Sequence, residues 1–144
     1  MKTPKLHFLD SGLVCYLLGI RRPEQLREHP LRGAIFESWV VSEIIKARSH
    51  GGLPPSLFFY RDRKGLEVDA VVDRATELLA VETKSGQTVA QDFFAALQKF
   101  VAAIQSQPHP PRVSRLVVYG GDRRQKRSEA TVVPWSEIDK VDWL

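Results

Sequence analysis

The chain has 144 residues, of which 43% are hydrophobic and 26% are charged, and its formal net charge is +4. This length suits one domain, and the composition excludes wholesale disorder, collagen-like sequence and a coiled coil. No apolar run approaches the ~18 residues that a membrane span needs, so no membrane partner is expected. Cys15 is the only cysteine, which excludes an intrachain disulfide and makes the reducing cytoplasm the expected location.

Hydrophobic spacing predicts two helices in the first third of the chain. The first spans Ser11–Leu18, with Asp10 as a candidate N-cap. The second runs from about Ala34 to Lys46, because its apolar side chains recur with helical spacing.

Strands are predicted next. Leu57–Tyr60 is a short apolar run, and Leu66–Asp73 alternates between apolar and polar side chains, so both favour strands. Leu78–Lys84 is the expected partner of the second strand, across a four-residue hairpin loop.

The last third of the chain predicts one helix and two more strands. Thr88–Ile104 has the spacing of an amphipathic helix, with Thr88 opening a capping box. The strands Leu116–Tyr119 and Thr131–Val133 follow, and Ser136 is expected to cap a closing helical turn. This element order predicts an α/β (α+β) fold with a central mixed sheet flanked by helices.

Positive charge is concentrated near the end of the chain. Residues 112–127 hold six basic residues and one acid, so this segment carries +5 and the rest of the chain −1. A local basic stretch is compatible with a phosphate-bearing partner, DNA or RNA, although charge alone favours a solvated loop. The residues expected to contact nucleic acid are Arg123, Arg124, Lys126 and Arg127.

Four polar side chains of the predicted hairpin form a candidate functional site. With the strands paired symmetrically about the loop 74–77, Asp69 lies opposite Glu82. Glu67 then lies opposite Lys84, and the alternation places all four side chains on one face. Facing carboxylates repel each other, so this pair predicts either a raised pKa on one acid or a bound cation. A hard divalent ion with oxygen ligands, Mg²⁺ or Mn²⁺, suits such a site.

Glu37 occupies an unusual position on the second predicted helix. Its neighbours one and two turns further along are all apolar, which places this glutamate on the buried stripe. These neighbours are Val40, Val41, Ile44 and Ile45. A buried carboxylate needs a partner. Stabilisation of the positive N-terminal end of the helix is the alternative role.

These positions together resemble the PD-(D/E)XK nuclease superfamily, in which a helix glutamate and a strand aspartate precede a strand with Glu-x-Lys. The corresponding residues are Glu37, Asp69 and Glu82-Thr83-Lys84. More narrowly, the chain resembles the uncharacterised domain found C-terminal to AAA+-type ATPases in bacteria and archaea. This likeness is carried by Lys5–Leu13, Gly33–Glu37, Phe59–Arg61, Gly65–Asp69, Val81–Lys84 and Val133–Trp135.

The resemblance implies a single domain over residues 1–144. Within it, residues 1–32 would be an N-terminal helical extension, 33–134 a restriction-endonuclease-like core and 135–144 a C-terminal cap. One departure is Val68, which stands before Asp69 where the superfamily name has a proline. The sequence also lacks a Gly-x-x-x-x-Gly-Lys-Ser/Thr nucleotide-binding loop, so an AAA+-type ATPase module is expected as a partner outside this chain.

The resemblance further implies a metal-dependent phosphodiester hydrolase. A Mg²⁺ or Mn²⁺ ion would be bound by Asp69 and Glu82, and Lys84 would orient the attacking water or stabilise the charge developing on phosphorus. The expected catalytic residues are Glu37, Asp69, Glu82 and Lys84, with Thr83 as a carbonyl ligand, Glu37 as ligand of a second ion, and Glu67 as a support that pairs with Lys84. The alternative is an inactive interaction or regulatory module that serves the ATPase or a protein or nucleic-acid partner.

The aromatic and thiol side chains are expected to be structural. Trp39, Trp135 and Trp143 are predicted to pack in or seal the core, and stacking on nucleic-acid bases is the alternative. Cys15 is expected to be a buried structural thiol.

Overall fold

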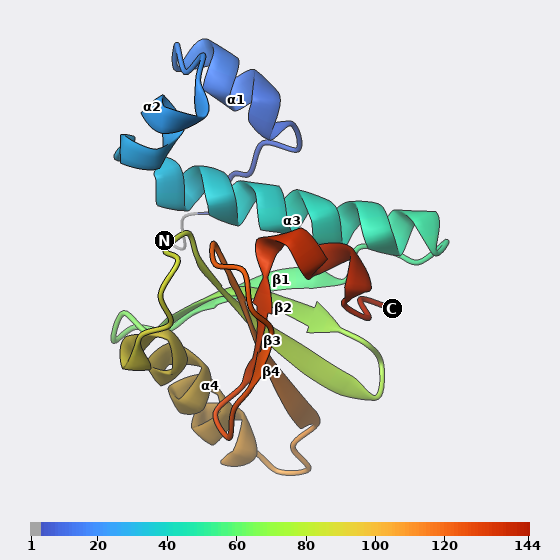
Figure 1. Cartoon of the computed structure of the whole chain (residues 1–144). Helices are drawn as coiled ribbons and strands as arrows, with labels where there is room; N and C mark the ends of the chain where they lie inside the picture. Colours follow the sequence, from blue (N-terminus) through green and yellow to red (C-terminus); the bar gives the residue numbers. More distant parts are fainter. Residues whose placement is uncertain (1–3) are drawn as a thin grey trace.

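The computed structural model describes residues 4–144. Three helices come before the first strand of a sheet, and a fourth helix lies between two of its strands (Figure 1). The helices are α1 (Ser11–Leu17), α2 (Pro23–Glu28), α3 (Arg32–His50) and α4 (Ala95–Gln105). The strands are β1 (Leu57–Arg61), β2 (Glu67–Asp73), β3 (Glu77–Lys84), β4 (Arg112–Tyr119), β5 (Gln125–Lys126) and β6 (Thr131–Pro134). Two 3₁₀ helices, η1 (Gln91–Phe94) and η2 (Trp135–Lys140), lie before α4 and after β6.

The six strands form one mixed sheet in the order β1-β2-β3-β4-β6-β5. The pairs β1–β2, β2–β3 and β5–β6 are antiparallel, whereas β3–β4 and β4–β6 are parallel. The connection from β3 to the parallel strand β4 contains α4, as a crossover between parallel neighbours requires. In Figure 1, α3 crosses one face of the sheet and α4 covers the other. The predicted mixed sheet flanked by helices is confirmed.

Each face of the sheet has its own apolar core. Under α3, the buried side chains of β2, β3 and β4 pack against Val40 and Ile44 of the helix. On the opposite face, Leu97 and Phe100 of α4 pack against the intervening residues of the same strands. This arrangement explains the valine-rich strands, because a sheet covered on both faces buries successive side chains on opposite sides.

The N-terminal helices lie on the outer side of α3, away from the sheet (Figure 1). The predicted cap of α1 is confirmed, since Asp10 Oδ1 accepts a hydrogen bond of 3.0 Å from the N–H of Leu13. Neither α1 nor α2 contains a buried residue, and Cys15 of α1 is half-buried. Helix α2 was not predicted, because its six residues carry no apolar stripe long enough to show a period. None of the helices within residues 4–144 is both long and apolar enough to cross a membrane.

Two predicted caps are wrong. The backbone at Ala90 is extended (φ −106°, ψ 157°), so the residues before it, including Thr88, are not helical, and the helix begins as the 3₁₀ turn η1. This turn places Phe93 and Phe94 in the core, and burial of these two rings outweighs a capping box. At the C-terminus, η2 begins at Trp135 and has no side-chain cap, so Ser136 does not act as one.

Arg48 ties the C-terminal part of α3 to the sheet and to the end of the chain. Its guanidinium is buried and donates hydrogen bonds to the carbonyl oxygens of Pro54, Asp73 and Trp143 at 3.0, 3.3 and 2.7 Å. Trp143, as predicted, is buried, and its Nε1–H donates to the carbonyl of Ile138. Three acceptors on separate segments thus depend on one side chain that also orients the helix carrying Glu37.

The substitution Arg48→Met is therefore expected to lower the free energy of unfolding by about 2–4 kcal/mol, because it removes the donor of three hydrogen bonds, one of them buried and two part-buried. Urea denaturation followed by tryptophan fluorescence measures this loss. Lys46→Met, at an exposed position of the same helix, is the control and should stay within about 0.5 kcal/mol of the parent. A similarly small change for Arg48→Met would contradict this role.

Candidate functional site

The β2–β3 hairpin has the predicted register. Asp73 pairs with Leu78, and the pairing continues step by step to Ala70 and Val81. Counted away from the loop, the regular pairing ends at Ala70, so Asp69 is the first residue of β2 outside it. The acids that were predicted to face each other therefore lie where the two strands begin to part.

A β-bulge in β2 accompanies this change. Phe58 pairs with Val71 and Tyr60 with Val68, so Phe59 of β1 faces two residues of β2. The two residues are Asp69 and Ala70. A bulge of this kind re-aims the side chains on one side of it, and bulges are common beside functional sites.

The bulge changes which face of the sheet the acids occupy. Ala70 belongs to the core under α3, whereas Val68, which regular alternation would place beside it, packs on the α4 side. Lys84 also lies on the α4 side, with its Nζ 5.8 Å from the ring centre of Phe93. Glu67, in contrast, shares an ammonium partner with a glutamate of α3. The prediction that all four polar side chains share one face is therefore wrong, because the bulge shifts the alternation by one residue.

Asp69 is held by β3. Its Oδ2 accepts hydrogen bonds from the backbone N–H and from the hydroxyl of Thr83, both at 2.8 Å. The carboxylate thus takes a backbone donor that would otherwise extend the β2–β3 ladder. Thr83, which was predicted as a carbonyl ligand, positions the Asp69 carboxylate through its two donors.

The ammonium of Lys5 lies among three carboxylates. Its Nζ is 2.5 Å from Glu37 Oε1, 2.6 Å from Glu67 Oε1 and 3.6 Å from Asp69 Oδ1. All four side chains are largely buried, with 15% to 27% of each exposed. Burial acts to lower the pKa of Lys5, but the hydrogen bonds to Glu37 and Glu67 outweigh it, so the pKa is raised. The cluster therefore contains a cation at neutral pH.

Lys5 was not predicted as a site residue. The segment before α1 is extended, and it turns Lys5 and His7 inward while Leu6 is 88% exposed. His7 Nδ1 lies 3.3 Å from the hydroxyl of Ser38, and its Nε2 is 3.9 Å from Glu37 Oε1. The signal that could have found this contact is a pair of polar residues two apart, since they share a side of an extended segment.

Glu82 and Lys84 form a second, adjoining pair. Lys84 Nζ lies 2.8 Å from Glu82 Oε1, whereas Glu82 Oε2 is buried and has no hydrogen-bond partner within residues 4–144. Burial, together with the charge of Asp69, raises the pKa of Glu82 to about 7, although Lys84 opposes the shift. Burial acts to lower the pKa of Lys84, but the hydrogen bond to Glu82 raises it overall.

The predicted support from Glu67 is wrong, because this side chain does not pair with Lys84. Glu67 instead bonds to Lys5, and its Oε2 accepts from Arg61 Nη2 at 2.5 Å. Burial acts to raise the pKa of Glu67, but the hydrogen bonds from Lys5 and Arg61 lower it overall. Glu67 is consequently part of the Lys5 cluster.

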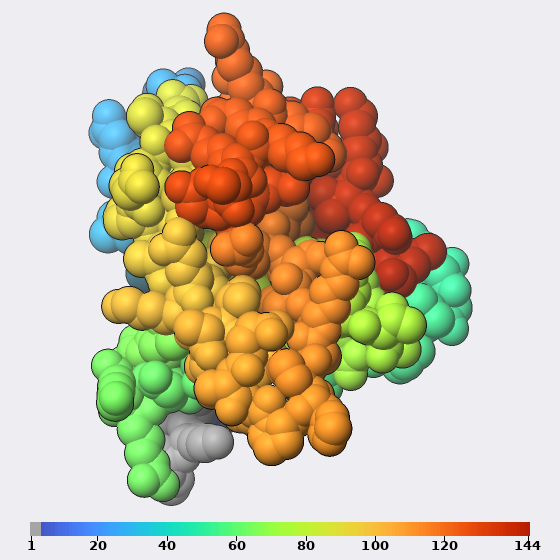
Figure 2. Space-filling model, turned by 90° about the horizontal axis from the view of Figure 1, so that it is seen from below, coloured from blue at the N-terminus to red at the C-terminus, as the bar shows by residue number. Residues whose placement is uncertain are grey.

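The basic segment lies apart from these acids. Its outer part includes β5, at the opposite edge of the sheet from β1, and Figure 2 shows the segment in orange to orange-red beside α4. Arg124 Nε pairs with Glu137 Oε2 at 2.9 Å, and the Arg127 guanidinium lies 5.7 Å from the ring centre of Phe94. Arg123, Arg124, Lys126 and Arg127 are all exposed. The structure does not bring them into contact with Glu37, Asp69 or Glu82.

The arrangement of the carboxylates bears on metal binding. Within residues 4–144, no three His, Cys, Asp or Glu side chains are grouped closely enough to hold one. The carboxylates nonetheless fit a hard cation chemically, because three of them already surround the Lys5 ammonium and Glu82 Oε2 has no donor in the same residues. Lys5 is therefore the cation among the acids of α3 and β2. For the pair Asp69 and Glu82, the structure shows the other predicted outcome, a raised pKa on one acid, Glu82.

The fold and the site define an α/β domain with an acidic cluster beside a bulged hairpin. The chain belongs to the family described as a domain of unknown function, DUF4143, whose profile matches residues 32–138. It is 26% identical over 139 residues to uncharacterized proteins of Mycobacterium bovis and Mycobacterium tuberculosis, covering 95% of this chain. The chain spans 29% of the length of these relatives. No solved structure matches it.

Proposed function

We propose that the domain is a metal-dependent phosphodiester hydrolase of the PD-(D/E)XK nuclease type. The observation that carries this proposal is the convergence of carboxylates from α3 and β2 on one cation, next to the Glu82–Lys84 pair of β3. The charge of Asp69 and that of Glu37 both act on Glu82, so the acids of three elements form one electrostatic unit.

Asp69, Glu82 and Glu37 would hold Mg²⁺ or Mn²⁺. When bound, the ion would supply the positive charge that polarises a phosphodiester and lowers the pKa of water. The position of Asp69 supports this role, because Thr83 donates to its Oδ2 and Oδ1 lies on the side of Lys5. The Lys5 ammonium would have to leave the carboxylates before a divalent cation could enter.

Glu82 and Lys84 would handle protons and charge. A carboxyl group with a pKa of about 7 is partly protonated at neutral pH, so Glu82 gives up a proton readily when a cation approaches. Lys84 keeps its proton, since its pKa is raised. Its Nζ would orient the attacking water or stabilise charge on the phosphoryl oxygens. The exposed arginines of residues 123–127 would contact the backbone of DNA or RNA without reading sequence.

A second candidate function has its own support. The Lys5 ammonium offsets part of the negative charge of the cluster without a metal ion, which is compatible with an inactive interaction or regulatory module. The exposed apolar side chains of the N-terminal segment would then contact a partner, such as an AAA+-type ATPase module; they include Leu6, Leu9, Leu13, Tyr16 and Leu17.

Titration calorimetry with Mn²⁺ and cutting assays separate the two candidates. For the hydrolase, we expect the parent to bind Mn²⁺ at millimolar concentration and Asp69→Ala to lose at least about tenfold in affinity while remaining folded, because one ligand is gone. Lys84→Ala should bind Mn²⁺ but cut single- and double-stranded DNA and RNA about 100-fold more slowly.

Glu43→Ala is the matched control, since this acid of α3 pairs with Lys46 outside the cluster. It should leave both Mn²⁺ binding and cutting unchanged. If the parent and a Lys5→Ala variant both fail to bind Mn²⁺ at millimolar concentration, the hydrolase proposal is overturned and the interaction module is favoured.

A further inference from the structure

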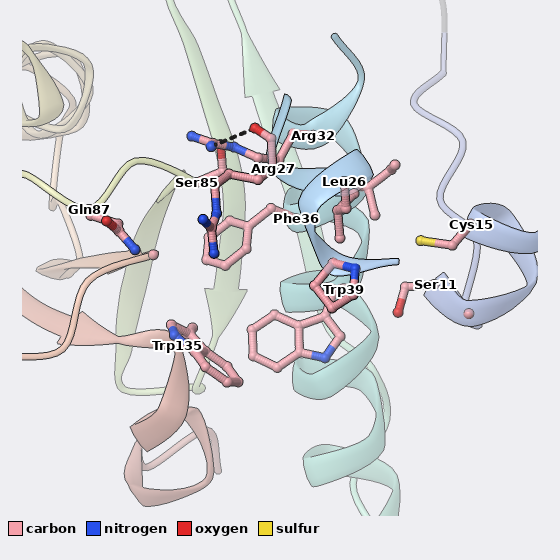
Figure 3. Close-up of a pocket in the computed structure, with 14 residues that line it drawn as sticks. Ser11, Cys15, Leu26, Arg27, Arg32, Phe36, Trp39, Ser85, Gln87 and Trp135 are labelled. Atoms are coloured by element: carbon pink, nitrogen blue, oxygen red, sulfur yellow. Dashed lines mark hydrogen bonds between the residues drawn. The ribbon is translucent and has the colours of Figure 1, made fainter. Parts of the chain in front are cut away.

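A cavity of about 670 Å³ lies between the N-terminal helices, the first half of α3 and the loops that follow β3 and β4 (Figure 3). None of the four predicted catalytic residues lines it. Its volume falls within the range of small-molecule sites, ~300–1,000 Å³. The cavity is thus a second concave feature of the domain, distinct from the carboxylate cluster.

One end of the cavity is aromatic. Trp39 lies 5.7 Å from Phe36 and 6.2 Å from Trp135 between ring centres, and the two indoles meet edge to face. Trp135 was predicted to seal the core, but 50% of it is exposed. It stands at the start of η2, directly after the buried Pro134, so the chain presents an indole outside the core. Such rings offer planar surfaces on which another ring can stack.

The other end of the cavity is positively charged. Figure 3 shows Arg27 and Arg32 beside Ser85, with Phe36 between them and the indoles. Arg32 Nε donates to Ser85 Oγ at 3.1 Å, and Arg32 Nη1 donates to the carbonyl of Arg27 at 2.9 Å. These bonds orient the guanidinium of Arg32 toward the loop after β3.

Among the described residues, no acid pairs with the arginines of this end. The cavity lining contains no Asp or Glu, and no ion pair involves Arg27 or Arg32 within the described residues 4–144. Two guanidinium groups without a carboxylate partner favour an anion. The forked donors of Arg27 and the remaining donors of Arg32 match the oxygens of a phosphate. Charge complementarity therefore selects an anionic ligand that also carries a ring.

We infer that this cavity binds a nucleotide unit, with its base against the Trp39–Trp135 wall and its phosphate on Arg27 and Arg32. A nucleotide joins a planar ring to a phosphate in one ligand, as the two ends of the cavity require. Base–aromatic stacking needs no particular sequence. The bound base must be unpaired, because a base within a duplex is stacked on its neighbours and cannot stack on the indoles. Ser85 follows Lys84 directly, so the cavity is one residue along the chain from the candidate site.

The inference does not depend on the hydrolase proposal, because stacking and guanidinium–phosphate contacts need no metal. The test is therefore carried out in EDTA. A fluorescein-labelled oligothymidylate of about ten nucleotides is titrated with the parent protein, and binding is followed by fluorescence polarisation. The competitors are unlabelled thymidine monophosphate, the unlabelled single strand, the same strand in a duplex, inorganic phosphate and an acidic peptide.

We expect Trp135→Ala to weaken binding roughly tenfold and Trp135→Phe to restore most of it, because stacking needs a ring and not the indole N–H. Arg27→Ala should weaken binding and lower the slope of log affinity against log salt by about 0.7, as expected for one lost phosphate contact on a single strand. Both side chains are exposed, so both variants should fold. Arg63→Ala, an exposed arginine of the β1–β2 turn, is the control and should change neither value.

The competitors distinguish the source of the nucleotide. If thymidine monophosphate by itself displaces the labelled strand, the ligand is a free nucleotide. If only single strands displace it, the ligand is a nucleotide within a chain. Both results support the inference. Unchanged affinity in Trp135→Ala, displacement by the acidic peptide and not by nucleotides, or equal displacement by inorganic phosphate would overturn it.

Discussion

Replacing Lys5 with alanine is expected to lower the free energy of unfolding by about 1–3 kcal/mol at neutral pH in EDTA. The variant would leave Glu37, Glu67 and Asp69 close together without the ammonium that now lies 2.5 to 3.6 Å from them. Millimolar Mn²⁺ should restore most of the loss, because a ligand that binds only the folded state stabilises it. Urea denaturation with and without Mn²⁺ measures both effects.

The loss of stability caused by Lys5→Ala should also become smaller as the pH falls. At present the lowered pKa of Glu67 contributes stability above its unfolded pKa, and this contribution is lost as the pH falls through the folded pKa. Without Lys5, the Glu67 carboxylate loses a hydrogen bond and a charge that lower its pKa. The variant therefore has less pH-dependent stability to lose than the parent, and the difference between the two proteins narrows as the pH falls.

Lys140→Ala provides the control for Lys5→Ala. Lys140 is 62% exposed and lies 3.7 Å from a single carboxylate, Glu137, so its loss should cost no more than about 0.5 kcal/mol and should not respond to Mn²⁺. Unchanged stability of Lys5→Ala would contradict the counter-ion role of Lys5. A loss of stability that Mn²⁺ does not restore would contradict exchange between the ammonium and a metal ion.

The substitution Glu82→Gln is expected to raise the free energy of unfolding at about pH 8 by about 1–3 kcal/mol in EDTA. The folded pKa of Glu82 is about 7, above the ordinary value of 4.5. Between these two values the native state holds a proton that the unfolded state has released, so stability decreases as the pH rises. Glutamine keeps the shape and removes this decrease, whereas at about pH 4 the two proteins should be equally stable.

The pH dependence of urea denaturation for the parent and Glu82→Gln tests this expectation. Glu43→Gln, on the surface of α3 and paired with Lys46, should differ from the parent by no more than about 0.5 kcal/mol at either pH. If Glu82→Gln is less stable than the parent at about pH 8, the ionised carboxylate stabilises the fold and the direction of the pKa shift given above is wrong. In the parent, Mn²⁺ should reduce the pH dependence, because a nearby cation favours the charged form.

Much of the fold was predictable because it depends on local pattern. Alternation and the four-residue loop were enough to obtain the β2–β3 register, since symmetric pairing about a short loop has few alternatives. The position of Glu37 was predictable for a similar reason, because a helix repeats every 3.6 residues and its apolar neighbours define the buried stripe. Asp10 as the cap of α1 depended on a single local hydrogen bond.

The bulge at Asp69 was not predictable from β2 alone. It arises where β1 supplies one residue, Phe59, against two of β2, which is a relation between two strands. Its consequence is large, because one inserted residue moves every following side chain to the other face. For this reason, the prediction that Glu67, Asp69, Glu82 and Lys84 share one face is wrong. The register between the bulge and the hairpin loop is nevertheless correct.

By itself, the sequence determined the mixed sheet between helices, the hairpin register and the closeness of Asp69 to Glu82, because each follows from periodicity or from a short loop. Only the tertiary structure decided that Lys5 is the cation among the acids and that Trp135 stands beside a cavity. Lys5 is 32 residues from Glu37, and Trp135 is still further from Trp39 along the chain. Contacts over such separations depend on how whole elements pack, and no local pattern records them.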